Sequence, residues 1–216
     1  MRPRRRYAVA ASCAIIASAL AGGSPANAGS QHAERAYQKT TTVHAKLREL
    51  NKSGASGKAQ VRVKGDKLDV RYSARGLVRN APHAVHIHYG EQARHECPTL
   101  ADDTNRDGRL TTLEGVPAYG PIVVSLTTRG DTSPASGLAV DRFPTAPKGK
   151  ISYHRHNIKT SADTAKDIRD GEAVLVIHGV DHNHNGRYDF KAGKSELDPK
   201  LPAEATNTAA CGVLRR

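Results

Sequence analysis

The sequence has no tryptophan, and aromatic residues make up only 4% of its 216 positions. Long hydrophobic runs are also scarce, since no uncharged apolar stretch after residue 28 approaches the roughly 18 residues that a transmembrane helix needs. We therefore predict no membrane span beyond residue 28.

The first 28 residues have the features of a signal peptide. Four arginines precede an uncharged apolar run from Ala8 to Ala21, and Ala26-Asn27-Ala28 offers small residues at a cleavage point. We predict that residues 1–28 are removed and that the mature chain is secreted or lies in the cell envelope. Residues 29–39 are polar and aperiodic, which predicts a disordered lead-in before a domain covering residues 40–216.

Cysteine is rare, with three residues in the whole chain. Cys13 lies inside the apolar run and leaves with the signal peptide. The two remaining thiols, Cys97 and Cys211, would lie in an oxidising compartment, where a pair of cysteines predicts one disulfide.

The charge is basic without being extreme. Removing the four arginines of residues 1–28, which contain no Asp or Glu, lowers the formal net charge from +12 to +8. Binding to nucleic acid would explain this charge, but it would explain neither the export signal nor the histidines described below. We therefore expect no nucleic-acid partner.

Alternation of apolar and polar residues predicts a protein built of short β-strands. A turn at Gly65-Asp66 separates two of them, and Ala162 to Arg169 is the one short helix that we expect. Residues 90–120 and 127–150 read as long loops. The predicted strands lie near residues 41–50, 59–63, 68–72, 84–89, 122–126, 150–158 and 173–177. About seven or eight such strands favour an all-β sandwich or barrel.

Two histidines stand at alternate positions of one predicted strand. His86 and His88 therefore project from the same face, where both imidazoles can bind one metal ion. His178 ends the apolar strand Val174-Leu-Val-Ile-His178, which places a third imidazole at the edge of a buried element. A structural or surface role for the His86 and His88 pair is the alternative.

The order of these parts resembles the copper/zinc superoxide dismutase family. Ser53-Gly-Ala-Ser-Gly57 resembles its first hairpin, and His83-Ala-Val-His-Ile-His88 resembles its copper-ligand strand HGFHVH. Val174 to His178 resembles its LVVH strand. Ala205-Thr-Asn-Thr-Ala-Ala-Cys-Gly-Val213 resembles its closing segment, whose cysteine pairs with one that occupies the place of Cys97.

The resemblance implies a Greek-key β-barrel of about eight strands, a disulfide between Cys97 and Cys211, and copper on His86, His88 and His178. The family's bridging histidine is missing, because Gly120-Pro121 is followed by Ile122. Its zinc loop has no counterpart of the right spacing, so zinc is not expected. Thr208 stands where the family has an arginine that guides anions.

Further histidines could complete a copper site. His154 and His156 form a second alternating pair, although two exposed polar residues are the simpler interpretation. His95, two residues before Cys97, is another candidate for a fourth ligand, and water is the remaining one.

An acidic segment from Asp103 to Glu114 fits the twelve-residue calcium loop. Gly108 permits the sharp turn at position 6, and a solvated turn is the alternative interpretation. The flanks read as loops, so we expect an isolated calcium loop. The candidate calcium ligands are Asp103, Asn105, Asp107, Arg109, Thr111 and Glu114.

A second segment, from Asp181 to Asp189, repeats the first half of this pattern. Gly186 stands at the turn, but position 12 is Ala192, so calcium would bind more weakly here. His182 and His184 could equally bind a transition metal. The weaker calcium candidates are Asp181, Asn183, Asn185, Arg187 and Asp189.

The sequence therefore supports an exported copper-binding protein resembling superoxide dismutase. Dismutation of superoxide through His86, His88 and His178 is a prediction from that resemblance. The protein's partner would be superoxide or a copper ion. A protein that binds or buffers copper without catalysis is the alternative, and so is a structural domain stabilised by calcium. Fold likeness alone does not choose between them.

Overall fold

The computed structural model of the protein describes residues 39–216. The predicted signal peptide and residues 29–38 of the predicted lead-in lie outside the described residues. Within the described range, no helix is long and apolar enough to cross a membrane.

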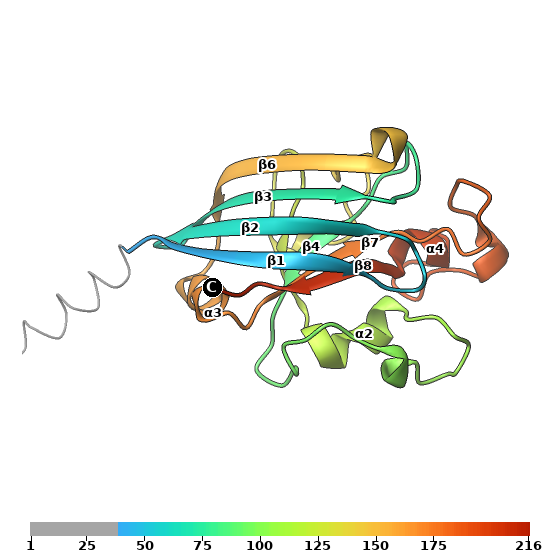
Figure 1. Ribbon diagram of the computed structural model, residues 1–216, viewed down its shortest axis with the longest axis horizontal. Helices are drawn as coiled ribbons and strands as arrows, with labels where there is room; N and C mark the ends of the chain where they lie inside the picture. The colour runs from blue at the N-terminus through green and yellow to red at the C-terminus, as the bar shows by residue number, and fades with distance from the viewer. Residues whose placement is uncertain (1–38) are drawn as a thin grey trace, which may run out of the picture. The chain divides into compact units, whose positions relative to one another are not determined.

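Eight antiparallel strands form one sheet that curls into a half-barrel (Figure 1). The strand order is β5-β4-β7-β8-β1-β2-β3-β6. The strands are β1 (Thr41–Glu49), β2 (Ser56–Lys64), β3 (Lys67–Arg75), β4 (Val85–His88), β5 (Ile122–Ser125), β6 (Lys150–Lys159), β7 (Val174–His178) and β8 (Thr208–Val213). The predicted all-β fold of about eight strands is confirmed.

The curl comes from β1, which takes part in both halves of the sheet. Thr41 to Leu47 of β1 pair with β2, whereas Arg48 and Glu49 pair with β8. The far edges, β5 and β6, are joined by side chains, because the Tyr153 hydroxyl on β6 donates a 2.9 Å hydrogen bond to the Thr127 carbonyl just after β5. Arg155 donates to the same carbonyl at 2.7 Å.

The core lies inside this curl and follows the period of two in the sequence. Val61 and Val63 of β2, Leu68 and Val70 of β3, and Ile87 of β4 are all buried with 1% exposure or less. The alternate residues of β1, β2, β3 and β6 point outward to solvent. One half of the sheet is therefore a wall with an apolar inner face and a polar outer face.

The predicted helix is observed as α3 (Ala162–Asp170), which begins after the cap Ser161 and ends at Gly171. The prediction that the flanks of the Asp103–Glu114 segment are loops is wrong, because the one-turn helix η1 (Leu100–Asp102) ends directly before the segment and a longer helix begins at its end. Thr111 caps a helix there, α2 (Thr112–Tyr119), and Glu114 completes the capping box. The shorter helices are η1 (Leu100–Asp102), η2 (Pro134–Ser136), η3 (Pro147–Gly149), η4 (Phe190–Ala192) and α4 (Ala203–Thr206).

The predicted disulfide between Cys97 and Cys211 is present, with its sulfur atoms 2.07 Å apart. It joins the loop that follows β4 to the middle of β8. This bond and a small second core around Tyr119 hold α2 against the outer face of β7 and β8. The two halves of the sheet thus differ, because the outer face of this half is covered by α2 and the loops next to it.

Candidate metal centre

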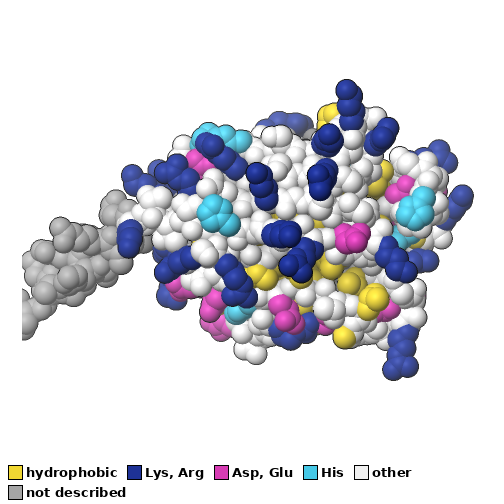
Figure 2. Space-filling model, viewed as in Figure 1, with side chains coloured by type: hydrophobic (Ala, Val, Ile, Leu, Met, Phe, Trp, Pro, Cys, Tyr) yellow, Lys and Arg dark blue, Asp and Glu magenta, His cyan; other side chains and the backbone are white. Residues whose placement is uncertain are grey.

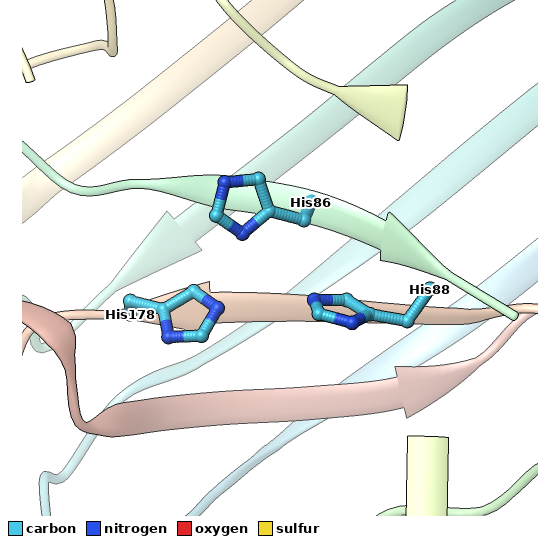
Figure 3. A group of neighbouring side chains, drawn as sticks. All are labelled: His86, His88 and His178. Carbon is cyan, nitrogen blue, oxygen red and sulfur yellow. The ribbon is translucent and has the colours of Figure 1, made fainter. Parts of the chain in front are cut away.

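Two adjacent strands bring three histidines together on the covered outer face of the sheet (Figure 3). His86 and His88 lie on β4, and His178 is the last residue of β7, which pairs with β4. The alternate residues Val85 and Ile87 point into the core instead. One ring nitrogen from each of His86, His88 and His178 lies within 4.8 Å of the other two. The structure thus groups the three histidines that the sequence singles out.

Each ring is held by one backbone carbonyl at the C-terminal end of a different short helix, because Gly120 follows α2, Gly137 follows η2 and Thr206 ends α4. His88 Nδ1 lies 2.8 Å from the Gly120 carbonyl, His178 Nδ1 lies 2.7 Å from the Thr206 carbonyl, and His86 Nε2 lies 3.1 Å from the Gly137 carbonyl. A carbonyl only accepts, so the nitrogen facing it must carry the proton. The other nitrogen of each neutral ring then presents a lone pair.

These other nitrogens are buried and have no hydrogen-bond partner: His86 Nδ1, His88 Nε2 and His178 Nε2. Buried polar atoms without partners are rare, because leaving one unsatisfied costs about 1–3 kcal/mol. Figure 3 shows these three nitrogens pointing toward one another, and one nitrogen of each ring lies within 4.8 Å of the other two. A single metal ion could therefore accept all three lone pairs. The donor set therefore fits a metal that accepts imidazole ligands.

Burial keeps the three rings neutral. Desolvation lowers the pKa of His88 to about 3 and that of His178 to about 4, and it lowers the pKa of His86 well below its usual value. Repulsion from the neighbouring rings adds to the lowering for His86 and His88. Metal ligation by imidazole needs this neutral form, which is present over the whole physiological pH range.

A pocket of about 370 Å³ opens beside His86 and His178. Its walls are apolar or uncharged, with Thr112 and the carbonyl side of Thr206 as polar neighbours. No charged side chain of the described residues lines it. The other wall residues are Ala84, Ile122, Pro134, Ala135, Gly137, Leu138 and Leu197.

The other candidate histidines lie elsewhere in the described chain. His95 Nε2 donates to the Gly90 carbonyl at 2.9 Å, and its ring stacks on Tyr89. His154 and His156 lie on the solvent face of β6, where both contact Asp69. These two rings and Asp69 form a separate group, so none of the three proposed substitutes reaches His86, His88 and His178.

Two residues near the centre carry structural roles that the sequence did not reveal. His83 is buried, and its Nδ1 lies 2.8 Å from the His178 carbonyl, while Tyr188 contacts its ring. Thr208, at the position where the resembled family has an arginine, is also buried, and its hydroxyl donates to the Leu110 carbonyl at 3.3 Å. Neither side chain lines the pocket.

The Asp103–Glu114 segment is folded as a loop around its own acidic side chains. Asp103 accepts from the backbone amides of Asp107 and Gly108, and Asn105 accepts from Asp107. Glu114 accepts from the amides of Thr104 and Thr111 with its two oxygens. These contacts fold Asp103, Asn105 and Asp107 around one turn and tie Glu114 to Thr104 and Thr111, and calcium binding there stays a prediction.

The Asp181–Asp189 segment has a similar turn, in which Asp181 accepts from the amides of Asn185 and Gly186. Glu204, which sequence reasoning missed, is fully buried behind it and accepts from the amides of His182 and Asp189. Little in the sequence points to Glu204, since it is a single acidic residue in a polar stretch. This carboxylate fixes the loop from inside the protein.

The chain is similar to one protein-family model and to solved structures of superoxide dismutase-like proteins. The CHRD domain matches residues 40–187. No curated protein sequence matches the chain. Among solved structures, a double mutant of a SOD-like protein from Bacillus subtilis aligns with 16% identity and a TM-score of 0.40, over 80% of this chain and 97% of that one. The Cu/Zn superoxide dismutase from Brucella abortus aligns with 18% identity and a TM-score of 0.38, over 82% and 100%.

The match of the CHRD domain covers more than half of the chain and includes His86, His88 and His178. Membership of the copper/zinc superoxide dismutase family, which the sequence resembles, stays a prediction. The chain belongs to the CHRD domain family.

Proposed function

We propose that this protein binds one copper ion through His86 Nδ1, His88 Nε2 and His178 Nε2. The observation that carries the proposal is that these three buried nitrogens lack any partner and point toward one another, in a group whose ring nitrogens lie within 4.8 Å. Imidazole suits copper, and copper when bound would supply one-electron redox chemistry.

The surroundings favour the monovalent ion, copper(I). The three donors are neutral, and no carboxylate lines the pocket among the described residues. Burying a charge in an apolar environment is costly, and the cost rises steeply with the charge of the ion. A singly charged ion that accepts three ligands therefore fits this site better than a divalent ion such as zinc.

The protein's own residues would hold the ion in place and limit access to it. The carbonyls of Gly120, Gly137 and Thr206 fix which nitrogen of each ring carries the proton, so the lone pairs are oriented before binding. Leu138 and Leu197 line the pocket beside the site and make its wall more apolar.

The pocket supports copper binding without dismutation better than it supports dismutation. Superoxide is an anion, and an enzyme gains encounter rate from positive charge near its site. The pocket lining contains no Lys or Arg, and Thr208 contributes none. Dismutation is the second candidate, supported by the opening beside His86 and His178.

Copper content and superoxide dismutation measured on the same sample test both candidates. The purified protein is loaded with copper(I) under reducing conditions, desalted, and analysed for copper per chain. We expect about one copper per chain in the wild type and none in H86A/H178A. The matched control is H154A/H156A, which removes two surface histidines and should keep the metal.

The outcomes separate the candidates cleanly. Stoichiometric copper with no dismutation supports a binding or buffering protein, whereas dismutation that H86A/H178A abolishes supports the enzyme. Copper that survives in H86A/H178A would overturn both.

The proposed setting is outside the cytoplasm, which is supported by the signal-like residues 1–28 and by the disulfide, because such bonds persist in oxidising compartments.

A further inference from the structure

The exposed wall of the half-barrel, formed by the outward side chains of β1, β2, β3 and β6, is strongly basic (Figure 2). These four strands contain eleven Lys and Arg residues, and all but Arg155 alternate onto the solvent face. The acidic residues of the four strands are Asp69 on that face and Glu49, which is exposed at the end of β1. We call this surface the basic wall.

The basic wall holds the whole net charge of the described chain. Residues 39–216 contain 28 Lys and Arg against 20 Asp and Glu. With ten cations and two acids placed on the wall, 18 cations and 18 acids remain elsewhere. Basic residues are thus concentrated on one face, while the rest of the described surface is balanced.

Most of these cations have no anionic partner within the described residues. Arg71 is the one cation of the wall within 4.0 Å of a carboxylate, and its partner Asp69 is 3.7 Å away. Asp69 is itself engaged by His154 and His156 at 3.0 and 2.9 Å. The positive potential of the wall is therefore not cancelled from within.

The middle of the wall is hollowed and hydroxyl-rich. A shallow hollow of about 760 Å³ crosses the four strands, with Ser73, Ser152 and Gln60 in its floor and Lys46, Lys58 and Arg71 around it. Outward side chains repeat about every 6.8 Å along a strand, and neighbouring strands lie about 4.8 Å apart. An extended chain with closely spaced anions could contact several cations at once, while its hydroxyls meet the serines and Gln60.

We propose that the basic wall binds a linear acidic polysaccharide. Single-stranded nucleic acid is favoured less, because its binding uses exposed aromatic rings for stacking. Tyr72 and Tyr153, the aromatic residues of these strands, are buried. A membrane surface is also favoured less, since the exposed large apolar side chains, such as Leu113 and Phe190, lie outside the four strands.

Binding of dextran sulfate to the purified protein tests the proposal, with uncharged dextran of the same length as the matched ligand. We expect dextran sulfate to bind at 50 mM salt, to weaken steeply as salt rises, and dextran not to bind. The variant K46Q/K58Q/R71Q should bind about tenfold more weakly, because each exposed charge pair contributes up to about fivefold in affinity.

The control variant K191Q/K194Q/K200Q removes three exposed lysines from a segment outside the wall. It has the same net charge as the wall variant, and its affinity should stay within about twofold of the wild type. Equal losses in the two variants would mean that net charge alone causes binding, and would overturn the proposal. Tighter binding to single-stranded or duplex DNA, or to phosphatidylglycerol vesicles, would also overturn it, as would no binding to dextran sulfate at 50 mM salt.

Discussion

The Nδ1 atom of His178 lies 2.7 Å from the Thr206 carbonyl, which directs the Nε2 atom of this ring toward the unbonded nitrogens of His86 and His88. In the metal-free protein, three lone pairs are therefore buried together without a partner. This arrangement destabilises the metal-free protein until an ion binds the three nitrogens.

Copper should stabilise the protein through these histidines. A ligand present at 1,000 times its Kd adds about 4 kcal/mol to the free energy of unfolding when it binds the folded chain alone. We expect copper(I) to raise the melting temperature of the wild type and of H154A/H156A, measured by scanning calorimetry. An equal rise in H86A/H178A would place the stabilising ion elsewhere.

Acid should destabilise the metal-free protein well before its carboxylates titrate. Burial lowers the pKa of His88 to about 3 and of His178 to about 4, whereas an unfolded chain takes up these protons near 6.5. The unfolded state therefore binds more protons between these values, and the free energy of unfolding falls as the pH drops from about 6.5 toward 4.

Denaturant unfolding at a series of pH values measures this effect. The variant H86A/H178A should show a shallower fall over the same interval, because two of the groups that take up protons are gone. A wild-type curve that is flat between pH 6.5 and 4 would contradict the neutral, buried state of the three rings.

Much of this architecture follows from the sequence because it rests on local patterns. Strict alternation in β2 and β3 predicts their inner and outer faces, and alternate spacing places His86 and His88 on one side of β4. Helix α2 was missed because its signals are mixed, since Gly115 and Pro117 oppose the capping box of Thr111 and Glu114.

The backbone groups that hold the three histidines could not be predicted from local sequence patterns. The carbonyls of Gly120, Gly137 and Thr206 lie at the ends of short helices, up to 51 residues along the chain from the histidines they hold. Every residue has a backbone carbonyl, so no residue type marks these three. Their role depends on the tertiary structure. Glu204 was missed for a similar reason, because only the tertiary structure buries it behind the Asp181–Asp189 turn.

Calcium should bind the Asp103–Glu114 loop and stabilise it. Partial burial raises the pKa of Glu114, but hydrogen bonds from Thr111 and Thr104 outweigh this and lower it, so both oxygens are available as a carboxylate. We expect millimolar calcium to raise the melting temperature, and E114Q to abolish most of the rise while keeping the helix cap.

The matched control for this test is D189N, which alters the second, weaker loop and should retain most of the calcium effect. A rise that persists unchanged in E114Q would move the ion away from the first loop. No rise at all would leave the segment a turn held by its own hydrogen bonds.

The disulfide should contribute strongly to stability because it closes a long loop. Cys97 and Cys211 are 114 residues apart, and the chain-entropy estimate for a loop of about 100 residues is about 4.7 kcal/mol, with native disulfides typically contributing 2–5 kcal/mol. We expect C97S/C211S to lose a few kcal/mol of unfolding free energy in denaturant unfolding.

The effect of C97S/C211S on copper binding should be smaller, because β4 and β7 pair directly and hold the three histidines without the bond. A variant that folds with wild-type stability would show that α2 and its core around Tyr119 dock without the covalent link, while loss of copper would show that the loop carrying the Gly120 carbonyl depends on it.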